Sequence, residues 1–182
     1  LNGERLIEFA RDCRKLIVGL ERIDASILSA LPELEVIAKY GVGTDMLDKH
    51  ALMRHGVRLG WTGGVNKRSV AELVIAFAIA LLRHVPLCHR DMSEGVWTNR
   101  QGRQLSGRTV GVIGCGHVGK DLTTLLRAFD CRVLAHDVLD FPAFYAAHHV
   151  EPTGVEDLLR RAEIVWPAVT AARPPPSAPF ES

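Results

Sequence analysis

The feature that most constrains this chain is an apolar, strand-like run that leads directly into a glycine-rich turn and then into a helical pattern. The run is Val110-Gly111-Val112-Ile113, and its β-branched residues are typical of a buried parallel strand. Gly114, Gly116 and Gly119 follow in the spacing Gly-x-Gly-x-x-Gly, with His117-Val118 between the last two. The first glycine permits a tight turn, the second lets a pyrophosphate approach the backbone, and the third lets the helix pack closely on the strand. The motif therefore predicts a dinucleotide-binding turn at the start of a helix.

The next predicted strand ends in an acidic residue, as a dinucleotide site requires. Cys131–His136 has the strand pattern, and Asp137 follows it, 18 residues after Gly119. An offset of about 20 residues places a carboxylate where it accepts hydrogen bonds from the adenosine ribose. Because an anion at this place repels a 2′-phosphate, Asp137 favours NAD over NADP. The alternative, from the residues alone, is a glycine-rich turn with a solvated aspartate at a strand end.

Strand and helix patterns also alternate through the first third of the chain. The predicted strands are Lys15–Val18, Leu34–Ala38 and Val57–Gly60. The predicted helices are Leu6–Cys13, Asp24–Leu31 and Met46–His55. This alternation is typical of parallel sheets with right-handed crossovers. We therefore predict an α/β fold with two parallel-sheet domains of the Rossmann-like or flavodoxin-like type; the family resemblance described below implies that both are incomplete.

An unbroken apolar run, Leu73–Leu82, lies between the two alternating regions. It is well short of the roughly 20 residues that cross a bilayer, so it predicts a buried helix. A helix that is apolar on every side must be covered on every side. We therefore expect it to lie between two domains or at a subunit contact.

Composition excludes several other classes of function. The formal net charge of +1 gives no reason to expect a nucleic-acid partner or an anionic membrane. The four cysteines have no CxxC spacing and follow no secretory signal, which favours reduced thiols and a cytoplasmic location. The eight histidines lack a complementary set of ligands, so we expect no metal site.

Four motifs, in order along the chain, resemble the D-isomer-specific 2-hydroxyacid dehydrogenases, and among them the phosphoglycerate dehydrogenases. The resemblance covers about Lys15 to Val165. Its motifs are Leu34–Asp45, Gly64–Leu73, Gly95-Val96-Trp97 and the glycine turn at Gly114–Gly119.

The resemblance implies specific roles for residues of this chain. The loop at Val42 and Gly43 would present backbone N–H groups to the carboxylate of a small 2-hydroxy or 2-oxo acid, and Asn66 would lie beside that substrate. From the residues alone, Asn66 is equally well explained as a helix N-cap. The glycine turn would bind the pyrophosphate, with His117 where the family often has arginine. The resemblance also implies a homodimer that pairs through the nucleotide domain.

The family transfers a hydride between a D-2-hydroxy acid and NAD with the help of an arginine and a histidine backed by a carboxylate. All three would follow Val165, so we identify no catalytic residue; Arg173 lacks the family's surroundings and is not assigned. From Trp166 the chain departs from the family pattern and becomes rich in proline. We expect residues 166–182 to form an irregular tail, which a shifted reading frame after Val165 would explain.

These observations give one principal prediction and two alternatives. Residues 1–66 would form part of a substrate domain, and residues 67–165 part of an NAD-binding Rossmann domain, in a dehydrogenase fragment with impaired catalysis. One alternative is an NAD-binding regulatory module, similar to a corepressor, without turnover. The other is a methyltransferase-like fold that binds S-adenosylmethionine, which Asp137 and the Val42-Gly43 and Asn66 motifs disfavour.

Overall fold

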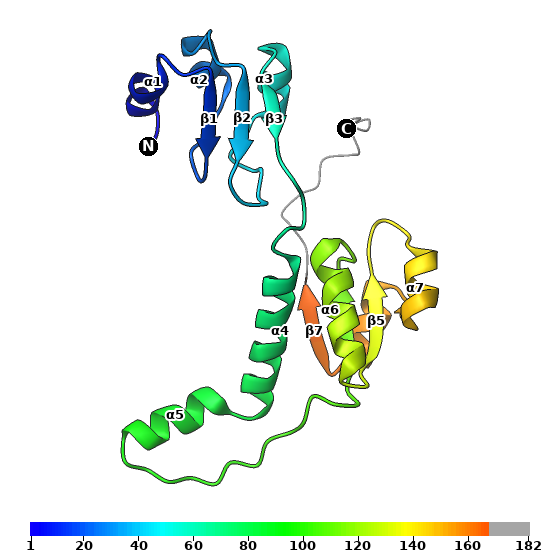
Figure 1. Cartoon of the computed structure of the whole chain (residues 1–182). Coiled ribbons are helices and arrows are strands. Elements are labelled where there is room, and N and C mark those ends of the chain that lie inside the picture. The colour runs from blue at the N-terminus through cyan, green and yellow to red at the C-terminus, as the bar shows by residue number, and fades with distance from the viewer. Residues whose placement is uncertain (168–182) are drawn as a thin grey trace. The chain divides into compact units, whose positions relative to one another are not determined.

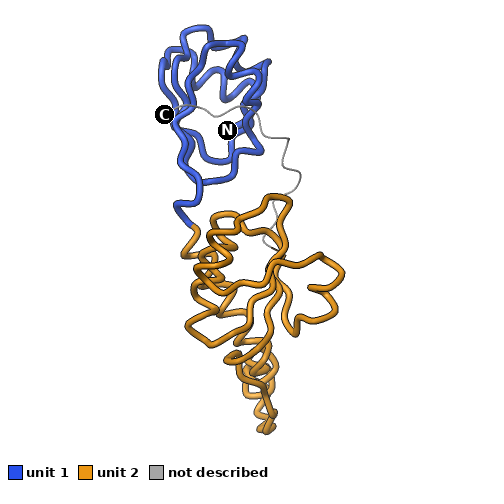
Figure 2. Tube along the Cα trace, turned by 90° about the vertical axis from the view of Figure 1, so that its right-hand side faces the viewer, with its two compact units in different colours: residues 1–66 blue, residues 67–182 orange. Residues whose placement is uncertain are grey.

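Two α/β units follow one another along the chain in the computed structural model, which describes residues 1–167. The chain divides between Asn66 and Lys67 (Figure 2). Each unit has a sheet and a hydrophobic core of its own.

The first unit is a three-stranded parallel sheet in the order β1-β2-β3 (Figure 1). Its strands are β1 (Lys15–Val18), β2 (Val36–Lys39) and β3 (Arg58–Gly60). Its helices are α1 (Glu4–Ala10), α2 (Ala25–Ala30) and α3 (Lys49–Arg54). All six elements lie where the sequence pattern predicts them, with ends that differ by a few residues.

Aspartates fix where two of these short helices begin. The Asp24 carboxylate accepts hydrogen bonds from the backbone N–H groups of Ser26 and Ile27, at 3.1 and 3.3 Å. Asp48 accepts one from Ala51 N–H at 2.8 Å. Each cap satisfies donors that the first turn of a helix leaves without partners. The caps set where α2 and α3 pack on the sheet.

The second unit contains a four-stranded parallel sheet in the order β6-β5-β4-β7. Its strands are β4 (Thr109–Ile113), β5 (Arg132–His136), β6 (Glu151–Pro152) and β7 (Ile164–Pro167). Its helices are α4 (Lys67–Leu82), α5 (Val85–Ser93), α6 (His117–Ala128), α7 (Pro142–His148) and α8 (Val155–Arg161). The predicted parallel α/β class is therefore confirmed.

Two neighbouring residues of β4 show that helices cover both faces of this sheet. A Cβ at Gly111 would overlap the Leu158 side chain of α8. A Cβ at Gly119 of α6 would lie 3.3 Å from Cγ1 of Val112. Because successive residues of a strand point to opposite faces, α8 packs on one face of β4 and α6 on the other. This doubly wound arrangement fixes the position of the turn between β4 and α6.

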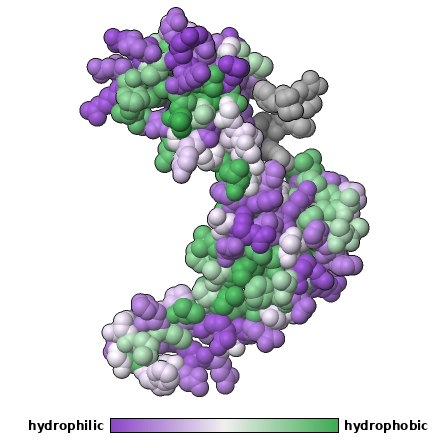
Figure 3. All heavy atoms as spheres, in the orientation of Figure 1, coloured by the Kyte–Doolittle hydropathy of each residue, from purple (hydrophilic) through white to green (hydrophobic). Residues whose placement is uncertain are grey.

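Helix α4 is less covered than predicted. Ala71 and Val74 are buried in the core of the second unit, but Leu73, Phe77 and Leu81 are 51%, 54% and 70% exposed. Within the second unit only one face of this helix is covered, so its own core does not bury it on every side; the expected cover by the other domain or by a second subunit stays a prediction. Apolar side chains gather along this helix in Figure 3.

Three further findings complete the comparison with the predicted elements. Helix α5 was not predicted. Trp166 and Pro167 belong to strand β7, so the prediction that an irregular tail starts at residue 166 is wrong for these two residues. The rest of that predicted tail lies outside the described residues. Pro167 is tolerated because β7 pairs with β4 alone among the described strands.

Within residues 1–167 no single helix is long and apolar enough to span a membrane; α4 and α5 meet that test only as a pair bent by 62°.

Candidate functional site

The turn between β4 and α6 requires glycine at two of its positions. Gly114 has a φ of +102°, a region that L-residues with a side chain rarely adopt, and its N–H donates to the His136 carbonyl at 2.7 Å. At Gly119 an added Cβ would overlap the carbonyl oxygen of Gly114 and lie 3.0 Å from its carbonyl carbon. These two glycines therefore shape the turn itself.

Gly116 differs from the other two because no contact within residues 1–167 requires a glycine there. It precedes α6 as the N-cap with extended backbone, makes no side-chain cap, and an added Cβ there would meet no atom within 4 Å. Gly116 and the following His117 are exposed, whereas Gly119 is buried. The first N–H groups of a helix lack partners within it and carry the positive end of the helix dipole. The open space beside Gly116 thus faces donors suited to a phosphate.

Asp137 lies directly against this turn. One carboxylate oxygen, Oδ2, accepts a hydrogen bond from the Cys115 backbone N–H at 2.5 Å. The other, Oδ1, accepts one from Leu139 N–H at 2.9 Å. The structure therefore brings together the glycine turn and the acid that ends the next strand, as the sequence pattern predicts. Carboxylate oxygens can each accept more than one hydrogen bond, so Asp137 can still accept from a ribose hydroxyl.

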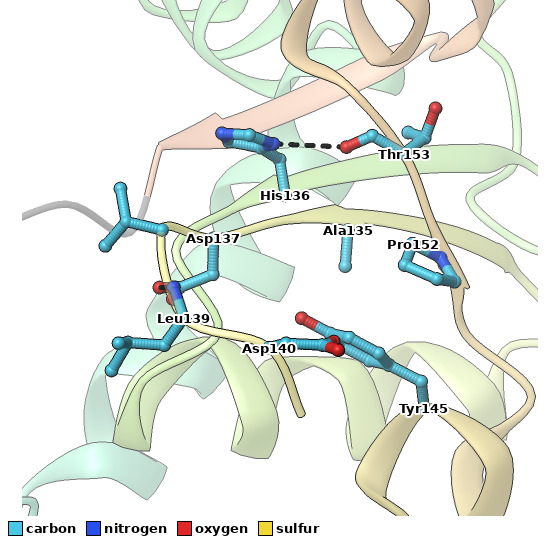
Figure 4. Close-up of a pocket in the computed structure, with 9 residues that line it drawn as sticks. Ala135, His136, Asp137, Leu139, Asp140, Tyr145, Pro152 and Thr153 are labelled. Carbon is cyan, nitrogen blue, oxygen red and sulfur yellow. Dashed lines mark hydrogen bonds between the residues drawn. The ribbon is translucent and has the colours of Figure 1, made fainter. Parts of the chain in front are cut away.

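A pocket of about 220 Å³ opens beside Asp137, where β5 and β6 end (Figure 4). His136 forms one wall, and its Nδ1 donates to the Thr153 carbonyl oxygen at 3.1 Å. The Tyr145 ring of α7 forms the wall opposite Thr153. Ligands of parallel α/β folds bind at the carboxyl ends of the strands, which is where this pocket lies.

Cys115 is buried within the turn, and its surroundings keep its thiol protonated. Burial, together with the nearby Asp137 carboxylate, raises the pKa of Cys115 to about 11. Burial also raises the pKa of the Tyr145 phenol to about 12, with Cys115, Asp137 and Asp140 adding to the effect. At neutral pH both groups are neutral, so Cys115 fills the turn as a small apolar residue and is not a nucleophile.

The first unit contains the other predicted site residues. The loop after β2 holds Val42 and Gly43, and Gly41 before them has a φ of +96°. Two long side chains fasten this loop: Trp61 Nε1 donates to the Val42 carbonyl at 3.1 Å, and Lys39 Nζ donates to the Tyr40 carbonyl at 2.8 Å. Lys39 also donates to the Gly19 carbonyl at 2.6 Å, which ties the loops after β1 and β2 together.

Sequence reasoning missed Lys39, Trp61 and Tyr145 as parts of these sites. Asn66 is the last residue of the first unit and comes directly before α4, a place that is compatible both with a substrate contact and with a helix N-cap.

Among residues 1–167, no three His, Cys, Asp or Glu side chains lie close enough together to hold a metal ion.

Comparison with known proteins identifies the protein family to which this chain belongs. The profile of the family "D-isomer specific 2-hydroxyacid dehydrogenase, NAD binding domain" matches residues 75–173. The chain belongs to this family. The predicted resemblance is thereby confirmed.

Individual relatives agree with this assignment. The chain is 29% identical over 170 residues to D-3-phosphoglycerate dehydrogenase of Homo sapiens, covering 92% of this chain and 31% of that enzyme. Among solved structures, the pyruvate reductase of Chlamydomonas reinhardtii matches with a TM-score of 0.78 at 27% identity, over 93% of this chain and 52% of that one. D-lactate dehydrogenase of Aquifex aeolicus, solved with NAD and lactic acid, shares the fold, with a TM-score of 0.80 at 22% identity over 90% of this chain and 50% of that one. The chain thus spans about a third of its curated relative and half of these solved chains.

The residues of the second unit fit NAD, the cofactor of this family. Gly116 leaves the space that a Cβ would narrow, the start of α6 supplies N–H donors for a pyrophosphate, and Asp137 supplies an acceptor for the ribose. The pocket beside Asp137 lies at the carboxyl ends of the strands, where the adenosine end of NAD would bind. The predicted cofactor is therefore confirmed.

Proposed function

We propose that this chain is the NAD-binding part, with a portion of the substrate domain, of an oxidoreductase that acts on D-2-hydroxy acids. The observation that carries the proposal is the hydrogen bond from Cys115 N–H to Asp137, which joins the phosphate turn to the ribose acceptor. When bound, NAD accepts a hydride from the hydroxyl-bearing carbon of such an acid. The residues of this chain bind and orient the reactants.

On the substrate side, we propose that the loop at Val42 and Gly43 binds the carboxylate. Its glycine-rich backbone can turn N–H groups towards an anion, and Lys39 and Trp61 hold it in place through their hydrogen bonds to its carbonyls. Asn66 would orient the same substrate through its carboxamide. The acid we propose to test first is 3-phosphoglycerate, because the curated human relative is a D-3-phosphoglycerate dehydrogenase.

We also propose that the protein works as a homodimer. Leu73, Phe77 and Leu81 are spaced four residues apart, so their exposed side chains form one apolar stripe along α4. Apolar stripes of this kind are typical of subunit contacts. A second copy of α4 would cover it.

The proposal is tested by mapping ligands onto backbone amide signals of the full chain by NMR. With NAD present, 3-phosphoglycerate and D-glycerate are each expected to shift the amides of Val42 and Gly43 in a saturable manner. A Gly43→Pro variant, which removes the Gly43 N–H and its signal, should weaken the response of the remaining Val42 amide. Shifts that are absent from this loop in the unsubstituted chain, or a Val42 shift with the same titration midpoint in the variant, would contradict the substrate assignment.

A further inference from the structure

The pocket beside Asp137 is lined by acids but by no strong base. Its charged or titratable lining residues are His136, Asp137, Asp140 and Tyr145, and no lysine or arginine is among the residues that line it. A phosphate on the 2′-oxygen of a dinucleotide would therefore meet carboxylates without a cationic partner.

Asp140 is the second of these carboxylates. It follows Asp137 by three residues and, like it, lines the pocket; Figure 4 shows its side chain beside the Tyr145 ring. The Asp140 charge acts on the pocket wall, because it contributes to the raised pKa of the Tyr145 phenol. Asp137 is tied to the backbone through both of its oxygens, whereas Asp140 lies on the exposed turn that leads into α7.

The lysine nearest in the packing, Lys120, contacts an aromatic ring and not the pocket. Lys120 of α6 lies over the Phe141 ring, with Nζ 3.6 Å from the ring centroid, and it does not line the pocket. His136 is held by its hydrogen bond to the Thr153 carbonyl. Lys120 is therefore not placed to offset the two carboxylates, and the histidine that lines the pocket has its Nδ1 engaged with a backbone carbonyl.

We propose that Asp140 is a second determinant of cofactor choice and acts with Asp137 to exclude a 2′-phosphate. NAD presents a neutral 2′-hydroxyl, which Asp137 can accept as a hydrogen-bond donor and which Asp140 does not repel. NADP presents a phosphate with a charge near −2, which both carboxylates repel. Substitution of Asp137 alone would leave a pocket that still disfavours NADP. The inference rests on the NAD site described above.

The test compares the affinities of the full chain for NAD and NADP, measured by calorimetry, in Asp140→Asn, Asp137→Asn and a matched control. The control is Asp130→Asn, which removes the same charge outside the pocket; its residue has a φ of +56°, which asparagine tolerates. For Asp140→Asn we expect NAD affinity to stay unchanged and NADP affinity to rise about 5-fold at low salt, with a smaller gain at high salt because the residue is exposed. Asp137→Asn should weaken NAD, and the double variant should bind NADP best.

The outcomes separate this inference from the cofactor assignment. An Asp140→Asn protein that binds NAD but has the NADP-to-NAD ratio of Asp130→Asn would overturn the role of Asp140 and leave the NAD site intact. Failure of the folded, unsubstituted chain to bind NAD would refute the cofactor site and this inference together. Asp140→Ser, checked by circular dichroism, provides a second variant with the same expected result.

Discussion

Alanine at two glycines of one turn should have opposite consequences. In a Gly119→Ala variant the added Cβ would overlap the Gly114 carbonyl oxygen and lie 3.3 Å from Val112 Cγ1, so either α6 or the turn must move. Overpacking of a well-packed interior costs about 1–3 kcal/mol and occasionally more, and an overlap with rigid backbone belongs at the upper end, a large part of the roughly 5–15 kcal/mol that stabilises a domain. Gly119→Ala should therefore lower the urea midpoint strongly.

Gly116→Ala should leave folding intact and damage NAD binding. Gly116 has a φ of −72° and open space around its Cβ position, so alanine there should change the free energy of unfolding by no more than about 1 kcal/mol, because the gain from a less flexible unfolded chain is opposed by alanine's poor fit to an N-cap. The added methyl group would occupy space needed by the pyrophosphate, and NAD affinity should fall at least about 10-fold, which corresponds to 1.4 kcal/mol. Gly154→Ala, at the N-cap of α8 with a similar extended backbone, is the control.

Urea unfolding and NAD calorimetry on the three variants check both expectations. A Gly119→Ala protein as stable as the unsubstituted chain would refute the packing argument. A Gly116→Ala protein that binds NAD as tightly as Gly154→Ala would show that the pyrophosphate does not lie beside Gly116.

Two further predictions concern stability. Burial raises the pKa of the Cys115 thiol from its ordinary value of 9.0 to about 11, so its contribution to the free energy of unfolding is complete below pH 9 and is lost as the pH rises through 11. Urea unfolding across this range should show that Cys115→Ala removes about 2 to 3 kcal/mol of the alkaline decline. An unaltered decline would contradict the burial argument. Leu158 is fully buried against Gly111. Leu158→Ala should cost about 2–5 kcal/mol in the same assay, whereas the exposed neighbour Leu159→Ala should cost little, and equal effects would argue against the packing of α8 on β4.

The elements of the NAD site were predictable because each depends on local patterns joined by a regular topology. In a parallel sheet β4 and β5 are neighbours, so Asp137 at the end of β5 must lie near the turn that ends β4. Its hydrogen bond to Cys115 N–H was not predictable, because it depends on the detailed path of both loops. Lys39 and Trp61 were missed for a similar reason: their partners Gly19 and Val42 lie 20 and 19 residues away, and no periodicity marks such contacts.

The environment of α4 shows another limit of the sequence pattern. An apolar run indicates that a helix will be covered but does not distinguish its own core from a partner's surface. The structure distinguishes the two faces of the helix, because Ala71 and Val74 pack in the core of the second unit while Phe77 is exposed. Helix α5 escaped prediction because it starts after His84 in the left-handed region, without a capping side chain to mark its beginning.

The central claim is that the turn at Gly114–Gly119 and Asp137 together hold NAD. It is tested most directly by titrating the full, isotope-labelled chain with NAD and following its backbone amide signals. The account predicts saturable shifts at Gly116, His117 and the Cys115 amide that donates to Asp137, and a titration midpoint at least about 10-fold higher in Gly116→Ala. Saturating NAD that leaves these amides unmoved in a folded chain, or that shifts only amides of the first unit, would contradict it.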